Sequence, residues 1–252
     1  MNVDQLARTL ADARARGVQA RPAWPEPAPS LSDAYAVQRA ANAIYMDASV
    51  GWKCGATNDG AQKGLGLDAP FIGPIPKRDV RGDGASVAFT ETVGAVEPEI
   101  AFKLARDLSG EVGPDEAAEA VEACHLVLEV IGRRVVGSGF DKGLGLIMDF
   151  AGNAVFVVGP SVADWRERDW TGIAVEGLRD AAVVERGSTG NVMGNPLASL
   201  AWAAKRLGQD GEGLRAGDWV STGTCTPAIQ AAHGVSVSAR FEGLGEVSVR
   251  FD

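Results

Sequence analysis

Short runs of β-branched and aromatic residues, separated by glycine-rich turns, dominate the chain from about residue 51 onward. Such runs are typical of strands, and the glycines between them are typical of tight turns. Helical character in this region is confined to a segment after Pro114 and to 196–207. Many strands with few helices predict a β-rich α+β fold whose sheet is closed or rolled to protect its edges. The predicted strands are 50–54, 87–89, 96–103, 126–131, 154–158, 173–178, 182–186, 219–221, 235–241 and 245–251.

The first fifty residues have a different character. Residues 2–17 and 32–46 place apolar side chains at helical spacing, and the second helix is expected to open at Ser32-Asp33. The stretch 18–30 contains four prolines and is predicted to be a connector. We therefore expect an N-terminal helical segment over 1–50 and a larger β-rich domain over 51–252.

Three glutamates lie inside apolar, strand-like runs. Glu97 and Glu99 belong to the run 96–102, and Glu129 belongs to the run 126–131. Side chains two residues apart in a strand point to the same face, so Glu97 and Glu99 share one face. Buried carboxylates need a partner charge or a metal, and no arginine inside these runs can compensate them. The pattern favours a hard divalent cation such as Mg²⁺ or Mn²⁺. The competing interpretation is an edge strand that exposes Glu97 and Glu99 to water.

Charge and cysteine content exclude several classes of protein. The 252-residue chain has a formal net charge of -9 and no run of lysines or arginines, which argues against nucleic acid as a partner. No apolar stretch approaches the roughly 18 residues of a membrane span. The 3 cysteines are far apart, so neither a disulfide framework nor a zinc motif is visible. Together with polar first residues that are unlike a signal peptide, these features predict a cytoplasmic protein.

A lysine and a hydroxyl-rich segment are further candidates for the site. Lys53 lies in the short apolar segment G-W-K-C-G. It can hold a substrate oxygen or transfer a proton, or it is a surface lysine whose stem packs on apolar groups. Thr222, Gly223 and Thr224 follow a predicted strand and are expected to form a turn that offers hydrogen-bond donors to a carboxylate. For His125 we favour a structural role over support of the glutamates. No G-x-S-x-G motif is present, which argues against a serine-hydrolase triad.

Taken in order, the motifs resemble one family along nearly the whole chain. It is the 2-oxopent-4-enoate hydratase / 4-oxalocrotonate decarboxylase branch of the fumarylacetoacetate hydrolase superfamily. The segments that carry the resemblance are G-W-K-C-G-A-T, L-G-L-D-A-P, E-P-E-I-A-F, L-E-V-I-G-R-R, G-N-P-L, G-D-W-V-S-T-G-T and F-E-G-L-G-E-V-S-V-R-F. No single motif is decisive, but the ordered set is specific.

The resemblance implies a mixed β-roll over 51–252 that carries the active site, a bound Mg²⁺ or Mn²⁺, and a short 2-oxo acid as substrate. The cation would stabilise the enolate of that acid. The resemblance also implies a homo-oligomer, with association with a pathway enzyme as a further option. The residues carried over are the metal ligands Glu97, Glu99 and Glu129, the catalytic residues Lys53 and Asp149, and the substrate-binding segment Thr222, Gly223 and Thr224. We also predict a catalytic role for Asp68 and a substrate-binding role for Phe71.

The chain departs from the family pattern on one side of the expected site. Phe71 stands where family hydratases commonly have a catalytic aspartate, and Phe150 and Gly152 replace the two polar residues N and S of a D-N-A-S segment. A third change is A-T-N where L-T-S is usual. Phenylalanine cannot activate water, so any hydration is expected to use Asp68 or Asp149. The departures disfavour ordinary dienoate hydration and favour decarboxylation, a bulkier or aromatic substrate, or a divergent role.

We therefore predict a metal-dependent lyase of 2-oxo acids, either a 2-oxo-4-enoate hydratase or a 4-oxalocrotonate-type decarboxylase. One alternative is an acylpyruvate-type C–C hydrolase, which needs a base to activate water. Another is a non-catalytic homologue that binds a partner. Metal content and turnover of a small panel of 2-oxo acids separate these classes.

Overall fold

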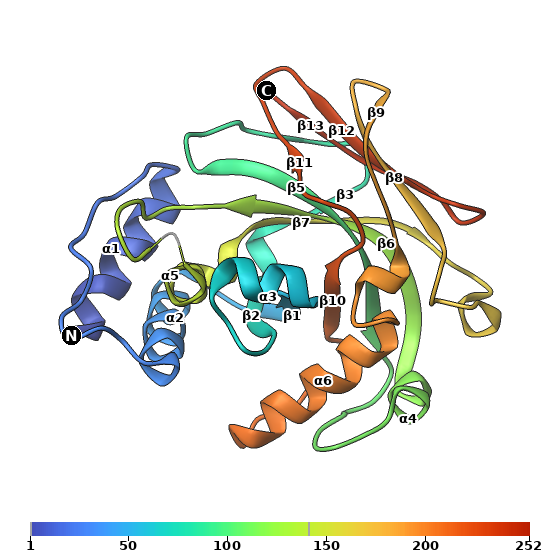
Figure 1. Ribbon diagram of the computed structural model, residues 1–252, viewed down its shortest axis with the longest axis horizontal. Helices are drawn as coiled ribbons and strands as arrows, with labels where there is room; N and C mark the ends of the chain where they lie inside the picture. The colour runs from blue at the N-terminus through green and yellow to red at the C-terminus, as the bar shows by residue number, and fades with distance from the viewer. Residues whose placement is uncertain (1, 141) are drawn as a thin grey trace.

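Two helices form one flank of the molecule (Figure 1). The computed structural model describes residues 2–140 and 142–252, so residues 1 and 141 lie outside it. Helix α1 spans Val3–Arg16 and α2 spans Leu31–Tyr45, which confirms both predicted helices. The expected start at Ser32 is wrong by one residue, because the helix begins at Leu31. Its N-cap is Ser30, which shares a capping box with Asp33.

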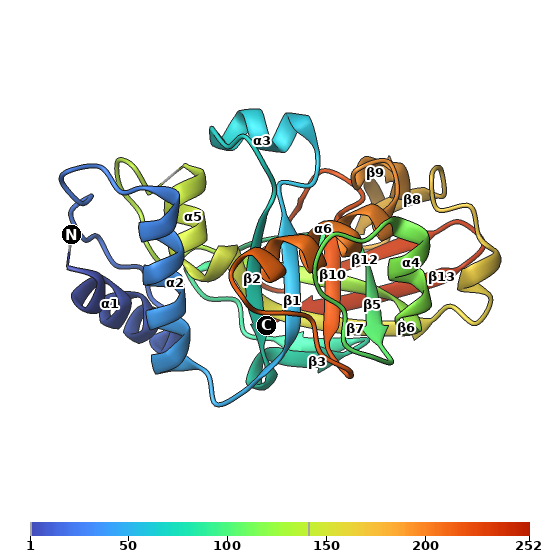
Figure 2. The ribbon, with the colours of Figure 1, turned by 90° about the horizontal axis from the view of Figure 1, so that it is seen from below.

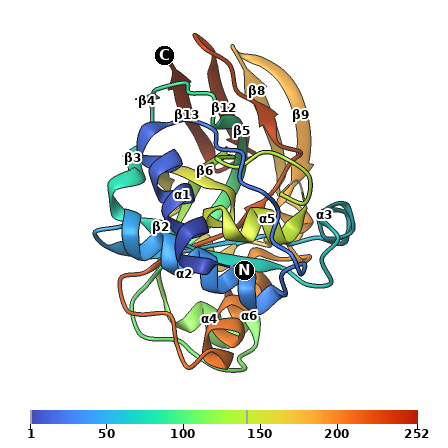
Figure 3. The same ribbon diagram turned by 90° about the vertical axis from the view of Figure 1, so that its left-hand side faces the viewer.

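The flank is attached to the body by packing between helices. Helix α1 contacts α2, and α2 contacts the short helix α5 (Gly143–Met148). Seen from this side, α1 and α2 lie in front of the strands (Figure 3). The apolar faces of both helices join the main hydrophobic core of the protein.

The larger sheet has eight strands in the order β2-β1-β10-β5-β6-β7-β3, with β11 paired to β5. It is mixed, because β1–β10 and β3–β7 are parallel and the other pairs are antiparallel. Its longest strands, β5 and β6, form the antiparallel pair at its centre. The strands are β1 (Ser49–Gly55), β2 (Phe71–Pro76), β3 (Val80–Gly82), β5 (Val93–Leu104), β6 (Val121–Gly132), β7 (Asn153–Ser161), β10 (Trp219–Thr224) and β11 (Ile229–Gln230).

A second sheet of five strands lies over one face of the first, in the order β4-β13-β12-β8-β9 (Figure 1). Strand β13 contacts β6 and β7 of the larger sheet. Its side chains Val247, Val249 and Phe251 are buried at alternate positions, as expected for a strand with one face in the core. The strands are β4 (Ala85–Val87), β8 (Ala174–Arg179), β9 (Ala182–Ser188), β12 (Ser236–Phe241) and β13 (Gly245–Phe251).

The remaining helices lie outside the sheets. Helix α6 (Pro196–Gln209) packs against β10 and against α4 (Pro114–Glu119). Helix α3 (Asp59–Leu65) buries none of its residues, and Figure 2 shows it projecting away from the body beyond β1 and β2. Within the described residues, no helix combines the length and apolar character needed to cross a membrane.

The predicted α+β class with rolled, mixed sheets and N-terminal helices is confirmed. The predicted strand 87–89 shares only Val87 with β4, and each other predicted strand overlaps an observed one over most of its length. The elements that were not predicted are β2, β3, β11, α3 and α5. Strand β2 contains Pro74 and Pro76, which weaken a strand pattern, and it is tolerated because it lies at the edge of its sheet. The boundary expected at residue 50 stays a prediction.

Candidate metal centre and substrate pocket

The three glutamates converge at the centre of the larger sheet. Glu97 on β5 lies directly opposite Glu129 on β6, and Glu99 follows on the same face of β5. One carboxylate oxygen from each of the three lies within 4.8 Å of the others. Glu99 and Glu129 are fully buried, whereas Glu97 is partly exposed. The alternative of an edge strand with wet glutamates is therefore wrong, because β5 is central and its glutamates face the interior.

Glu99 is held by one of its two oxygens. Oε2 accepts hydrogen bonds from Ser221 Oγ at 2.5 Å and from the backbone N–H of Gly223 at 2.9 Å. Oε1 is buried and has no hydrogen-bond partner among the residues that the structure describes. A buried carboxylate oxygen without a donor is costly, and a cation satisfies it. This orphaned oxygen fits a site whose ligands are the three glutamates.

Lys53 lies beside the glutamates and is 3% exposed, so the alternative of a surface lysine is wrong. Its Nζ is 2.8 Å from Glu129 Oε2 and donates to the carbonyl oxygen of Ala151 at 3.1 Å. The same atom lies 5.2 Å from the centre of the Phe71 ring. An ammonium group has three N–H donors; Ala151 accepts one, and the Glu129 contact is an ion pair, so at least one N–H remains for another acceptor.

The charges of the cluster do not balance. Among the described residues, three carboxylates face one ammonium, so the cluster has an excess of two negative charges when all three carboxylates are ionised. Burial raises the pKa of Glu97 to about 7, against a smaller lowering by Lys53. Burial and the other two carboxylates raise the pKa of Glu99 well above its ordinary value. A divalent cation supplies the two missing positive charges, so the residues present fit Mg²⁺ or Mn²⁺.

A small pocket of about 100 Å³ opens over Lys53 and Glu97. Its wall is mostly apolar, and Lys53 is the single basic side chain among the described residues that line it. Thr57 and Asn58 also line an outer groove of about 640 Å³, so they stand at its mouth. The apolar wall consists of Ala56, Ala61, Leu65, Phe71, Ile131, Leu146 and Ala151.

The structure does not bring two predicted catalytic aspartates to this pocket. Asp68 is exposed and lies outside the pocket lining. Asp149 is fully buried, but its carboxylate is paired with Arg134, with Oδ1 2.7 Å from Nε and Oδ2 2.6 Å from the backbone nitrogen. This pair ties the turn that carries Ala151 to the end of β6. Asp149 therefore contributes to the site by holding the Lys53 acceptor in place.

The predicted turn at Thr222–Thr224 is wrong, because β10 continues through Thr224 with an irregular register after Ser221. Gly223 donates to Glu99, and the Thr222 hydroxyl donates to the carbonyl oxygen of Ile100 at 2.8 Å. Thr224 lines the pocket. A role for Thr222 and Gly223 in binding substrate stays a prediction, since their observed contacts are within the protein.

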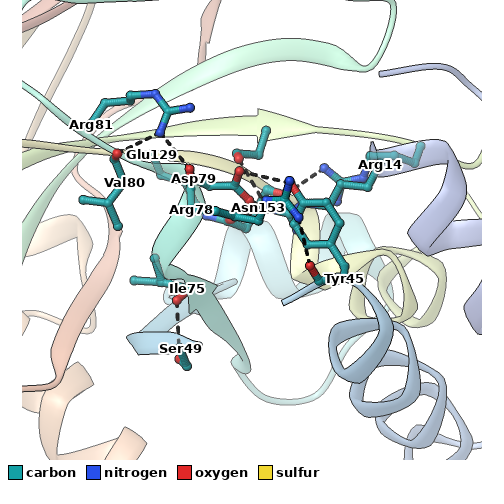
Figure 4. A network of polar contacts seen from close by, with 12 residues as sticks. Arg14, Tyr45, Ser49, Ile75, Arg78, Asp79, Val80, Arg81, Glu129 and Asn153 are labelled. Atoms are coloured by element: carbon teal, nitrogen blue, oxygen red, sulfur yellow. Dashed lines mark hydrogen bonds and ion pairs between the residues drawn. The ribbon is translucent and has the colours of Figure 1, made fainter. Parts of the chain in front are cut away.

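Sequence reasoning missed the residues that orient the glutamates. Ser221 holds Glu99, and Asn153 donates from Nδ2 to Glu129 Oε1 at 3.1 Å. Asn153 is in turn contacted by Arg14 of α1 (Figure 4). The sequence feature that could have indicated a role for Ser221 is its position in a strand with several small hydroxyl residues. No local signal marks Asn153 or Arg14, which reach the site from distant segments. His125 instead contacts the carbonyl oxygen of Gly159 and does not touch the cluster.

A rolled α+β fold with three converging glutamates, two of them fully buried, and a buried lysine defines a class of protein that the family comparison identifies. The family model described as "Fumarylacetoacetate (FAA) hydrolase C-terminal" matches residues 61–252. The chain belongs to the fumarylacetoacetate hydrolase family.

Relatives along nearly the full length are lyases. A 2-keto-4-pentenoate hydratase of Burkholderia vietnamiensis (strain G4 / LMG 22486) is 31% identical over 99% of this chain and 97% of its own length. A 4-oxalocrotonate decarboxylase of Pseudomonas putida is 30% identical over 89% of this chain and 87% of its own length. The solved structure of 4-oxalocrotonate decarboxylase from Pseudomonas putida G7, complexed with magnesium and adipate, matches with a TM-score of 0.92 and 27% identity, covering 99% of this chain and 97% of that one.

Proposed function

We propose that this protein is a divalent-metal-dependent lyase that acts on a short 2-oxo acid, and that it favours loss of CO₂ over addition of water. The observation that carries the proposal is the orphaned, buried oxygen of Glu99 inside a triad of glutamates, beside Lys53 at the base of the pocket. The hydratases and decarboxylases among its relatives, and the magnesium in one related structure, support the same class.

Glu97, Glu99 and Glu129 would hold the cation, Mg²⁺ or Mn²⁺. When bound, it supplies a Lewis acid that stabilises negative charge developing on the keto oxygen of a 2-oxo acid. Lys53 supplies the remaining N–H of Nζ to the substrate carboxylate or to the developing enolate oxygen. Because Glu129 and the Ala151 carbonyl already fix this ammonium, little reorganisation accompanies the reaction.

The pocket wall favours decarboxylation. Phe71 and Ala151 present apolar surface, and neither can activate a water molecule. Among the described lining residues no second basic group is available to pair with a distal carboxylate. A carboxylate held there without a cation is poorly stabilised, whereas neutral CO₂ suits an apolar wall. We infer a small substrate as well, because the pocket holds about 100 Å³.

The test is a panel of short 2-oxo acids, assayed with Mg²⁺ and with Mn²⁺ for loss of dienol absorbance and, in parallel, for CO₂ release. We expect CO₂ release from a vinylogous 2-oxo diacid to exceed hydration of 2-hydroxypenta-2,4-dienoate. Phe71→Asp should raise hydration, and Phe71→Leu, which restores no proton acceptor, should not. Efficient hydration by the unmodified protein would contradict the preference. Absence of turnover across the panel would favour a non-catalytic homologue.

Lys53→Met tests the role given to the ammonium. It should lower kcat/KM by at least about 100-fold, the range that positioned proton donors contribute. The variant must remain folded by circular dichroism for the comparison to hold. A kcat/KM near that of the unmodified protein would show that Lys53 serves only to neutralise Glu129.

A further inference from the structure

Arg14, in the last turn of α1, reaches from the helical flank into the interior of the larger sheet. Its side chain is 4% exposed. Its terminal nitrogen donates to Asp79 at 2.7 Å and to the amide oxygen of Asn153 at 2.9 Å. The guanidinium lies between the rings of Tyr45 and Phe150, at 4.6 and 4.5 Å from their centres. Figure 4 shows this approach from α1 toward Asn153 and Glu129.

Arg14 determines which way the Asn153 amide faces. A guanidinium only donates hydrogen bonds, so it requires the amide oxygen on its side. The amide nitrogen must then face the opposite side, where it donates to Glu129 Oε1 at 3.1 Å. Asn153 is fully buried, so no water competes for either end. The result is that Glu129 Oε1 is occupied and Oε2 is directed toward Lys53, 2.8 Å away.

We propose that Arg14 is a positioning residue for the metal centre, acting through Asn153 on Glu129. The inference rests on the metal site proposed above. Partners one step removed from the ligands orient those ligands and tune their affinity for the metal. The N-terminal helices would then belong to the working site, although Arg14 precedes residues 61–252, the span of the family match.

The pair of Arg14 with Asp79 is complete without Asn153. Asp79 accepts from Arg14 on Oδ2 and from the Tyr45 hydroxyl on Oδ1, at 2.7 and 3.0 Å. A guanidinium has five N–H donors, so a buried arginine needs several acceptors, and Arg14 also donates to the carbonyl oxygen of Ala154 at 3.3 Å. The contact to Asn153 connects the same nitrogen to a group whose other end touches a ligand of the proposed cation. A structural role and a positioning role therefore predict different effects on metal affinity.

The experiment measures Mn²⁺ affinity by electron paramagnetic resonance of the free ion and by calorimetry. Removing Arg14 alone would leave the buried Asp79 without a partner of opposite charge, so the variant is Arg14→Met combined with Asp79→Asn. We expect Mn²⁺ binding to weaken by about 10- to 100-fold. Arg16→Met is the matched control, because Arg16 lies in the same turn but is 65% exposed and pairs with Asp12. Its Mn²⁺ affinity should equal that of the unmodified protein.

Asn153→Leu completes a double-mutant cycle. If Arg14 acts through Asn153, adding the Arg14 and Asp79 changes to Asn153→Leu should weaken Mn²⁺ binding no further. Should the Arg14→Met variant fail to fold, Arg14→Gln with Asp79→Asn keeps polar groups at both positions but is too short to reach Asn153, and the same loss is expected. Unchanged affinity in the folded variant, or additive losses in the cycle, would overturn the inference. Failure of the unmodified protein to bind Mn²⁺ would overturn the metal site and the inference together.

Discussion

At the scale of single residues, the two carboxylate oxygens of Glu99 differ in their hydrogen bonding. Ser221 and the Gly223 backbone both donate to Oε2, while Oε1 is left for a cation. In Glu99→Gln these donors would keep the amide oxygen at the position of Oε2. The amide NH₂ group would then occupy the position of Oε1 and repel the cation. We expect Mg²⁺ and Mn²⁺ affinity, measured by calorimetry, to fall by at least about 100-fold, beyond the loss typical of partners one step removed.

Glu122→Gln provides the control for this substitution. Glu122 lies on β6, the strand of Glu129, but its side chain is 54% exposed and pairs with Lys103 at 3.4 Å. It loses one negative charge without touching the cluster, so metal affinity should stay within about twofold, since exposed charges are screened. Equal affinities in both variants and the unmodified protein would remove Glu99 from the ligand set.

The residues that could be predicted from sequence are those whose chemistry conflicts with their surroundings. Glutamates and a lysine inside apolar runs stand out because burying them alone is costly. Asn153 and Arg14 have no such local conflict, since each is an ordinary residue until the fold brings it to a distant partner. Asp149 was placed in the site by resemblance, but its nearest charged group is Arg134 rather than the pocket. Sequence cannot show that kind of pairing between separate segments.

At the scale of elements, the irregular end of β10 is a part of the site. The strand pairing between β10 and β5 shifts between Ser221 and Thr224, which turns the Gly223 N–H toward Glu99. Gly223 has a φ of +110°, and a Cβ there would come within 2.1 Å of Thr57 Oγ1. Gly223→Ala should therefore destabilise the protein by about 1–3 kcal/mol and weaken Mn²⁺ binding, because the strand must move away from Glu99. Thermal unfolding and calorimetry measure the two effects.

Gly217→Ala separates backbone strain from the contact with Glu99. Gly217, just before β10, also has a positive φ of +88°, but a Cβ there meets nothing within 4 Å. It should lower stability by about 1 kcal/mol and leave Mn²⁺ affinity unchanged. A comparable loss of affinity in Gly217→Ala would mean that the shift in β10 is only a structural irregularity.

Elements were predictable where the pattern was strong and regular. The long strands β5 and β6 have continuous apolar runs, and α1 and α2 have clear helical spacing, so their existence followed from periodicity. Strand β2 did not follow, because its prolines argue against a strand unless its edge position is known. The turn expected at Thr222–Thr224 failed for a related reason. Glycine and threonine are typical of turns, yet here they build an irregular strand whose geometry is set by contacts with β5.

At the scale of the whole molecule, the rolled architecture followed from the many short strands and from the resemblance. The contact between the helical flank and the site could not be predicted from the sequence. Segments from both ends of the chain and from its middle contact one another around the glutamates. Tertiary packing determines such contacts, and the local sequence pattern does not show them. The stability of the fold is consequently linked to the state of the cluster, because three buried carboxylates and one ammonium leave an unbalanced charge in its centre.

This linkage predicts how pH affects the metal-free protein. The pKa of Glu97 is raised by burial from 4.5 to about 7 in the folded state. Between these values the folded state binds more protons than the unfolded chain, so the free energy of unfolding decreases as pH rises through this window. The pKa of Lys53 is lowered by burial but raised more by the three glutamates, so Lys53 stays charged on both sides of the window. In EDTA, we expect Glu97 alone to cost on the order of 3 kcal/mol between pH 5 and pH 8, or roughly 5–10 °C in Tm, and the raised pKa of Glu99 adds a loss of the same sign.

Saturating Mg²⁺ or Mn²⁺ should counteract this loss, because the cation binds the ionised carboxylates of the folded state. At a concentration of 100 times Kd the gain is about 2.7 kcal/mol, and it should be largest at pH 8, where protons do not compete. Thermal unfolding across this pH range, with EDTA and with metal, measures both effects. Glu97→Gln should reduce the pH dependence in EDTA, since a neutral amide has no proton to gain or lose, while the raised pKa of Glu99 should preserve the rest of it. A metal-free protein whose Tm rises from pH 5 to pH 8 would contradict the excess of negative charge, and with it the main argument for the proposed divalent cation.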